Sequence, residues 1–379
     1  MAKKTLRRLE LQRIGEEQFV SDINRDYTGE QKKILLCYLD YQCTVRELRQ
    51  NFGHTNRQEM MQIIKVCIEK DWCIDICGCN DRNAIEYIRA DYYDFILGFG
   101  DVFRYAREHN PKALSILYMT ENPYDISYAR ETERIAYFKE RTGRNFTLER
   151  TGVYYQKDDE KKADAVLCLG DERYFPAGKR VFRIWPSALK NPVFSLDFSQ
   201  KKRTNFLIYG TDGFVHKGND ILVEIFGRHP EWTLYLCGAR GEEKAKEAGY
   251  RLPSNVHAVG FVDTMSEQFN EIVKKCYYLL LPSCSEAPST AVLTGMRHGM
   301  LPVVSRGIGL DGLAEYCVYF EDYHVERVED LLRQLAEEGT EEKILQQRSR
   351  NVMEYADAHY RLKDYTESFR RAINAFVDM

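Results

Sequence analysis

The sequence of 379 residues lacks any apolar run close to the roughly 18 residues that a membrane span requires. It also lacks the charged and apolar regions of a secretory signal peptide. Its net charge is only −4, and no DNA- or RNA-binding motif is present. The electrostatic footprint of a nucleic-acid-binding protein is therefore missing. We expect a cytoplasmic protein with no nucleic-acid partner.

Paired cysteine motifs are missing as well. The 11 cysteines are an odd number and are scattered, many within apolar runs, which favours reduced thiols. Cys73, Cys77 and Cys79 lie close together, but their spacing matches no zinc pattern and no second cluster follows. Buried thiols are the better interpretation, and we expect no metal or other cofactor.

The chain does contain two successive alternations of strand-like and helical segments. Its length exceeds one ordinary core, and 44% hydrophobic and 30% charged residues are typical of a globular protein. Strands separated by helices indicate βαβ units and mostly parallel sheets. We predict an α/β fold of two Rossmann-like, doubly wound parallel-sheet domains that face a cleft. The expected divisions are an N-terminal basic extension (1–31), an N-terminal domain (32–195), a C-terminal domain (196–364) and a final helix (365–379).

Two segments of the first half are rich in charge. Residues 1–14 mix five basic side chains with leucines and isoleucine. We interpret them as an extension with a solvated or self-packed face; the alternative is a basic helix on the inner, anionic membrane surface. The charged segment Tyr128–Arg141 is predicted to pack on one face of the first sheet. A polar stretch, Ser195–Arg203, is expected to be the hinge between the domains.

The stretch Cys276–Ser305 has the pattern of a ligand-binding turn. The apolar run Tyr277–Leu281 predicts a buried parallel strand, which stops at Pro282 and is followed by a small-residue turn ending at Glu286. A helix is expected to start near Ser289. Its first N–H groups, around Ser289, Thr290 and Ala291, suit a phosphate, and Glu286 suits hydroxyl groups. The alternative is a structural connection with a solvated glutamate.

A second phosphate-compatible turn follows the strand predicted at Phe206–Tyr209. It contains Gly210 and Gly213, then Lys217 and Gly218, but neither the Walker nor the dinucleotide glycine spacing. Both turns follow strands of one parallel sheet, so we expect Lys217 and Glu286 to face the same crevice. The alternative for Lys217 is an exposed lysine at a helix start.

Five motifs occur in the order known from one enzyme family: Gly210 to Ile225, Leu234 to Gly238, Asn255-Val256 with Gly260 to Val262, Pro282 to Glu286, and Gly299 to Val304. The chain resembles nucleotide-sugar glycosyltransferases of the GT-B fold, most of all the retaining family 4 group and its bacterial polysaccharide-assembly relatives. The resemblance covers residues 205–320 well. The N-terminal half matches only loosely, through residues 53–56, 118–120, Glu131 and Arg134.

The resemblance implies transfer of a sugar from a nucleotide diphosphate donor to a glycan or lipid-linked acceptor in surface polysaccharide or glycoconjugate synthesis, with retention of configuration. Lys217 would neutralise the donor diphosphate and Glu286 would bind donor-sugar hydroxyls. Phe261 and Val262 would line the base pocket. His54 would face the transferred sugar or the acceptor, unless it is a capping or core histidine. Helix dipoles and basic side chains would replace a metal ion.

Two departures from the family pattern leave alternatives open. Thr294 stands where relatives have a ribose-binding glutamate, and it suits packing inside a helix better than binding a ribose. Thr211 and Asp212 stand where relatives tend to have an arginine; Arg240, Arg297 and Arg306 are candidate replacements. The chain is then either an active enzyme or a non-catalytic, nucleotide- or glycan-binding partner of one; a sugar-nucleotide epimerase on this fold is a third hypothesis. His216 and His298 are predicted to be structural or surface residues.

Overall fold

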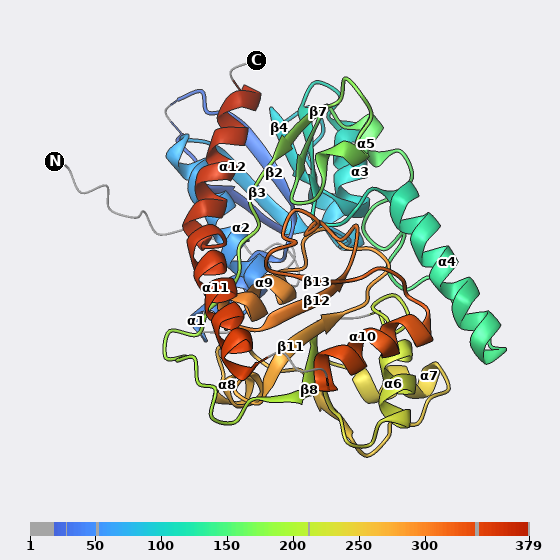
Figure 1. Ribbon diagram of the computed structural model, residues 1–379. Helices are drawn as coiled ribbons and strands as arrows, with labels where there is room; N and C mark the ends of the chain where they lie inside the picture. Colours follow the sequence, from blue (N-terminus) through green and yellow to red (C-terminus); the bar gives the residue numbers. More distant parts are fainter. Residues whose placement is uncertain (1–18, 28, 51–52, 211–212, 338–340, 378–379) are drawn as a thin grey trace.

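The computed structural model describes residues 19–27, 29–50, 53–210, 213–337 and 341–377. These residues form two α/β domains, each around its own sheet (Figure 1). Within them, no helix combines the length and apolar character that crossing a membrane requires. Residues 1–14, with the suggested membrane contact, lie outside the described residues, as do Thr211 and Asp212.

The N-terminal sheet has the strand order β1-β3-β2-β4-β5-β6-β7 and is parallel except at β1. Its strands are β1 (Phe19–Ile23), β2 (Lys33–Tyr38), β3 (Cys73–Gly78), β4 (Phe95–Gly98), β5 (Leu114–Met119), β6 (Ala165–Cys168) and β7 (Arg180–Arg183). Its helices are α1 (Tyr41–Arg49), α2 (Thr55–Glu69), α3 (Gly100–His109), α4 (Tyr124–Thr142) and α5 (Asp159–Lys162), with short 3₁₀ turns at Arg82–Tyr87 and Glu172–Tyr174.

The C-terminal sheet is parallel throughout, with the order β10-β9-β8-β11-β12-β13. Its strands are β8 (Lys202–Tyr209), β9 (Thr233–Cys237), β10 (Val256–Gly260), β11 (Cys276–Leu281), β12 (Leu301–Ser305) and β13 (Val318–Phe320). Its helices are α6 (Asn219–Arg228), α7 (Gly241–Glu247), α8 (Glu267–Val273), α9 (Thr290–Arg297), α10 (Val325–Glu337) and α11 (Glu342–His359); α12 (Leu362–Val377) follows. The predicted fold class of two parallel-sheet domains is confirmed.

The strand order of the C-terminal sheet determines where a ligand fits. The chain starts at β8, adds β9 and β10 on one side, then returns to add β11, β12 and β13 on the other. The point between β8 and β11 is a topological switch, and in open α/β sheets ligands bind beyond the carboxyl ends of the strands there. All six residues of β11 are buried, as expected for a central parallel strand.

The last helix belongs to the core of the first domain. Tyr365, Phe369 and Phe376 of α12 are buried among the side chains of the N-terminal sheet and its helices. The hydroxyl groups of Tyr365 and Tyr118 lie 3.2 Å apart. The helix therefore crosses back onto the N-terminal domain, alongside α2 (Figure 1).

The structure differs from the sequence-based expectation in two places. Residues 19–23, inside the expected N-terminal extension, form the edge strand β1, which pairs antiparallel with β3. Helix α4 does not simply cover one face of the first sheet. Near its end, Arg141 pairs with Asp220 and Glu224 of α6 in the second domain, and Phe138 is buried in the C-terminal core. Its amphipathic pattern could not reveal which domain its apolar face contacts.

Candidate functional site

Lys217 and Glu286, predicted to face the same crevice, form an ion pair between Nζ and Oε1. Lys217 lies in the turn after β8 and Glu286 in the turn after β11, on either side of the topological switch. Their side chains are only 8% and 14% exposed. Burial alone would raise the pKa of Glu286, but the charges of Lys217, His216 and Arg150 lower it instead, so the carboxylate is ionised.

The carboxylate of Glu286 has one oxygen left for a ligand. Lys217 Nζ and Ser283 Oγ (3.0 Å) both donate to Oε1. From the residues that the structure describes, Oε2 receives no hydrogen bond. An ionised, half-buried carboxylate oxygen of this kind is a strong acceptor for a sugar hydroxyl.

Two glycines of the turn after β8 lie against other parts of the site, Gly210 against the side chain of Lys217 and Gly218 against the backbone of Pro282. A Cβ at Gly210 would lie 3.6 Å from Cδ and Cε of Lys217, so the lysine stem passes directly over this glycine. Gly218 has a φ of +76°, and a Cβ there would meet the carbonyl oxygen of Pro282 at 2.6 Å. Gly218 is required because the turn passes close to the end of β11.

The N-terminal domain holds the turn that bears Glu286. Asn122 Nδ2 donates to Ser285 Oγ (3.0 Å) and to the carbonyl oxygen of Glu286 (2.9 Å). Arg134 Nη2, on the buried side of α4, donates to the carbonyl oxygen of Pro282 (2.9 Å). The position of Glu286 therefore depends on both domains.

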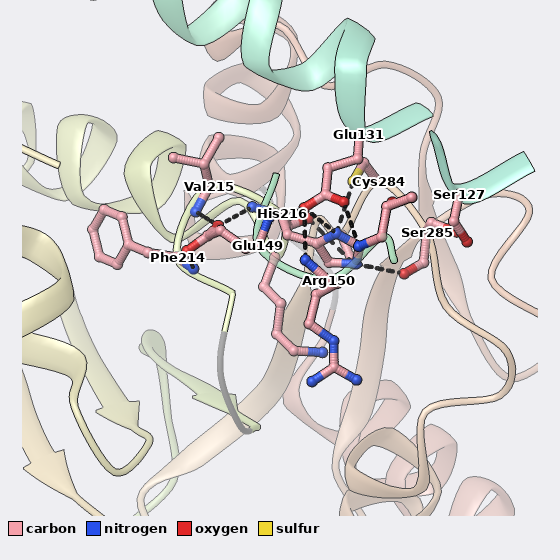
Figure 2. A network of polar contacts seen from close by, with 12 residues as sticks. Ser127, Glu131, Glu149, Arg150, Phe214, Val215, His216, Cys284 and Ser285 are labelled. Atoms are coloured by element: carbon pink, nitrogen blue, oxygen red, sulfur yellow. Dashed lines mark hydrogen bonds and ion pairs between the residues drawn. The ribbon is translucent and has the colours of Figure 1, made fainter. Parts of the chain in front are cut away.

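A buried ion pair joins α4 to the turn after β8 (Figure 2). Oε1 of Glu131 lies 3.2 Å from Nδ1 of His216, and both side chains are at most 4% exposed. His216 Nε2 bonds the carbonyl oxygen of Ser285 (2.7 Å). A ring that bonds acceptors through both nitrogens is a cation. His216 is therefore structural, as predicted, but it also connects three segments from two domains.

A chain of carboxylates continues this network. Glu131 accepts hydrogen bonds from the backbone N–H groups of Glu149, Arg150 and Thr151 at 2.7 to 3.0 Å. The carboxylate of Glu149 in turn accepts three N–H groups of the turn after β8, at 2.8 to 2.9 Å (Figure 2). Those donors, Phe214, Val215 and His216, form the kind of backbone nest that binds anions. Here a carboxylate of the other domain fills it.

The pair between Glu131 and His216 makes stability depend on pH. Burial alone would lower the pKa of His216, but its contacts with Cys284 and Glu131 raise it to about 10. Because this exceeds the unfolded value of about 6.5, the stabilisation is complete below that pH and is lost as pH rises toward the folded-state pKa. The free energy of unfolding should be larger for the wild type than for His216→Gln. This difference should be largest near pH 6.5 and below, and should shrink as the pH rises toward 10. Denaturant titrations at several pH values measure this difference. The control is His257→Gln, because His257 is exposed. A difference that does not change with pH would contradict the assignment.

The N-terminus of α9 lies next to Glu286 in sequence and in space. Ser289 is its N-cap residue without a side-chain cap, and Thr290 and Ala291 follow half-buried. Its first N–H groups have no partner within the helix and are available to a phosphate. Thr294 is not brought to this site: it is 1% exposed, and its Oγ1 accepts a hydrogen bond from the N–H of Leu189 in the interdomain linker (3.2 Å).

The remaining predicted residues lie where the two domains meet on the other side of β8. His54 is the N-cap residue of α2. The adjoining Gly53 N–H donates to Asp263 Oδ1 (2.9 Å), two residues after Phe261. Phe261 is 46% exposed, whereas Val262 is buried. His54 and the predicted base-binding segment thus face each other across the domain boundary, although the structure gives no direct contact between His54 and Glu286.

A pocket opens between the turn after β8 and the start of α7. Its lining includes Gly210, Gly213, Lys217, Gly238, Arg240, Gly241 and Lys244, but not Phe261 or Val262. Three basic side chains at one pocket suit an anionic ligand. Of the three arginines considered as replacements for the missing family arginine, only Arg240 lines it. Arg306 pairs with Glu321, and Arg297 pairs with Asp357.

Several residues that build the site were missed in the sequence. Asn122, Glu149 and Arg150 lie in loops of the N-terminal domain with no periodic pattern. Asn122 and Glu149 bond the other domain, whereas the guanidinium of Arg150 pairs with Glu121 of its own domain. Glu131 and Arg134 could be found only as part of the loose family resemblance. Their role depends on α4 lying along the second domain, which no local signal predicts.

Comparisons with known proteins identify the fold. No known family model matches the chain, and no curated protein matches its sequence. Among solved structures, it is similar to sucrose-phosphate synthase from Thermosynechococcus elongatus (TM-score 0.61, 12% identity, 92% of this chain and 100% of that one). It is also similar to Anabaena HepE in complex with UDP and glucose (TM-score 0.56, 10% identity, 91% and 100%). A third is WaaG, a glycosyltransferase involved in lipopolysaccharide biosynthesis (TM-score 0.56, 17% identity, 89% and 98%). The chain has the GT-B fold of these glycosyltransferases.

Proposed function

We propose that the protein is a glycosyltransferase that moves a sugar from a nucleotide diphosphate donor to a glycan or lipid-linked acceptor in polysaccharide or glycoconjugate synthesis. The observation that carries this proposal is the buried pair of Lys217 and Glu286 at the topological switch, beside the N-terminus of α9. A cation, an ionised acid and free helix N–H groups at one point match a sugar diphosphate. The neighbours HepE, with UDP and glucose, and WaaG support it.

The proposal gives each group a role. Lys217 and the first turn of α9 would stabilise the negative charge that grows on the leaving diphosphate, without a metal ion. Glu286 would hold donor-sugar hydroxyls through Oε2. We assign the acceptor side to the region near His54. Retention of configuration is part of the proposal through the family resemblance.

Two observations favour a second candidate, a nucleotide- or glycan-binding partner without catalysis. The hydroxyl of Thr294 accepts a hydrogen bond from Leu189 of the linker and is therefore not available to a ribose. The carboxylate of Glu149 occupies backbone N–H groups near the donor site. Both features reduce the contacts available to a donor. Such a protein would bind a nucleotide sugar and leave it intact.

The test is calorimetric titration with UDP-, GDP-, ADP- and dTDP-sugars, followed by assay of the donor that binds. A transferase should release the nucleoside diphosphate in the presence of a glycan or lipid-linked acceptor. Binding without release would favour the partner protein, and isomerisation of the donor without acceptor would reveal an epimerase. Absence of binding at millimolar concentrations of every donor would refute the proposed function.

A further inference from the structure

The donor site needs a second cation, and the two other basic side chains of the pocket beside Lys217, Arg240 and Lys244, are already paired with acids. A diphosphate carries more charge than Lys217 neutralises alone, and Lys217 is already paired with Glu286. Arg297 and Arg306 are held away by Asp357 and Glu321. Arg240 pairs with Glu243 and Glu247 at an exposed position.

Arg150, from the N-terminal domain, lies beside Lys217. A Cβ at Gly213 would be 3.5 Å from Cγ of Arg150 and 3.6 Å from Cγ of Lys217, so both stems run past the same glycine. The arginine side chain leads away from the network of Glu131 and His216 (Figure 2). Burial would raise the pKa of Glu286. The positive charge of Arg150, together with those of Lys217 and His216, lowers that pKa instead, so Glu286 stays ionised.

The backbone of Arg150 is fixed on both sides. Its own N–H and that of Thr151 donate to Glu131 at 3.0 and 2.8 Å. The side chain of Glu149, directly before it, is bound to the turn that leads to Lys217. The loop therefore has a defined position relative to the donor site, although it belongs to the other domain.

The guanidinium has a partner that a phosphate can replace. Arg150 Nη2 forms an ion pair with Glu121, which follows β5, and both side chains are 21% exposed. Guanidinium groups bind carboxylates and phosphates in the same planar geometry. The carboxylate of Glu121 would therefore compete with a donor phosphate for the guanidinium.

We propose that Arg150 is the second cation of the donor-phosphate site and replaces the arginine that the turn after β8 lacks. This inference rests on the proposed function. The diphosphate is held by Lys217 from one domain and Arg150 from the other. Donor affinity then depends on the two domains being closed against each other.

The test is calorimetric titration of wild type, Arg150→Gln, Arg150→Lys and Arg240→Gln with UDP, GDP, ADP and dTDP. For the nucleotide that binds, Arg150→Gln should weaken affinity about tenfold or more, with a smaller loss for Arg150→Lys. Arg130→Gln is the matched control, because Arg130 also reaches the other domain, at the carbonyl oxygen of Gly307, and should bind as wild type does.

Glu121→Gln provides an independent variant, because it leaves Arg150 intact and removes its competing carboxylate. Affinity should then rise severalfold. Equal affinity in wild type and Arg150→Gln, or a loss in Arg240→Gln alone, would overturn the inference while leaving the proposed function standing. Failure of the wild type to bind any of the four nucleotides would instead refute the proposed function, and this inference with it.

Discussion

Replacing Glu286 by glutamine is expected to lower the rate of sugar transfer by about two orders of magnitude or more. The carboxylate is ionised and offers Oε2 to the donor sugar, while Oε1 holds Lys217 in place. The amide keeps the shape but loses the charge. Steady-state kinetics with the donor found by titration would measure the loss.

The control for this variant is Glu321→Gln. Glu321 also pairs with a basic residue, Arg306, but on the surface and away from the topological switch. It should transfer sugar at the wild-type rate, and circular dichroism should show both variants folded. A Glu286→Gln enzyme with unchanged turnover would remove Glu286 from the mechanism.

Replacing Glu131 by glutamine is expected to reduce the free energy of unfolding by about 3–5 kcal/mol, because it breaks a buried ion pair and leaves His216 without its counter-charge. Glu131 also accepts three backbone hydrogen bonds, and the amide NH₂ cannot replace both carboxylate oxygens. Chemical denaturation followed by fluorescence gives the change.

Glu133→Gln is the matched control on the same helix. Glu133 is exposed and bonds Tyr323 at the surface, so its change should stay within about 0.5 kcal/mol. In the double variant with His216→Gln, the loss should be smaller than the two single losses combined, since both remove one interaction. Strict additivity would show that the two residues do not act as a pair.

Much of the fold was predictable because its pattern is local. The strands β9 (Thr233–Cys237) and β13 (Val318–Phe320) are short apolar runs between polar turns, a pattern that indicates a strand from the sequence alone. The pairing of Lys217 with Glu286 was predictable for a geometric reason. Carboxyl ends of neighbouring parallel strands meet at one edge of a sheet, so the turns that follow β8 and β11 must lie close together.

The parts that were not predictable depend on how the domains meet. Helix α4 has the pattern of an ordinary amphipathic helix, and only the packed structure shows Arg134 against Pro282. Glu149 and Arg150 lie in a loop without periodicity, so nothing local indicates the distant groups they bind. Thr294 stands at a family position, yet its hydroxyl is used by Leu189 of a linker whose path is not encoded in any motif.

We propose that a nucleotide diphosphate sugar binds between the turns after β8 and β11. A crystal structure of the protein soaked with the donor selected by titration tests it most directly. We predict the diphosphate within hydrogen-bond distance of Lys217 Nζ and the first N–H groups of α9, with a sugar hydroxyl on Glu286. A donor bound elsewhere, with the ion pair of Lys217 and Glu286 untouched, would contradict this account.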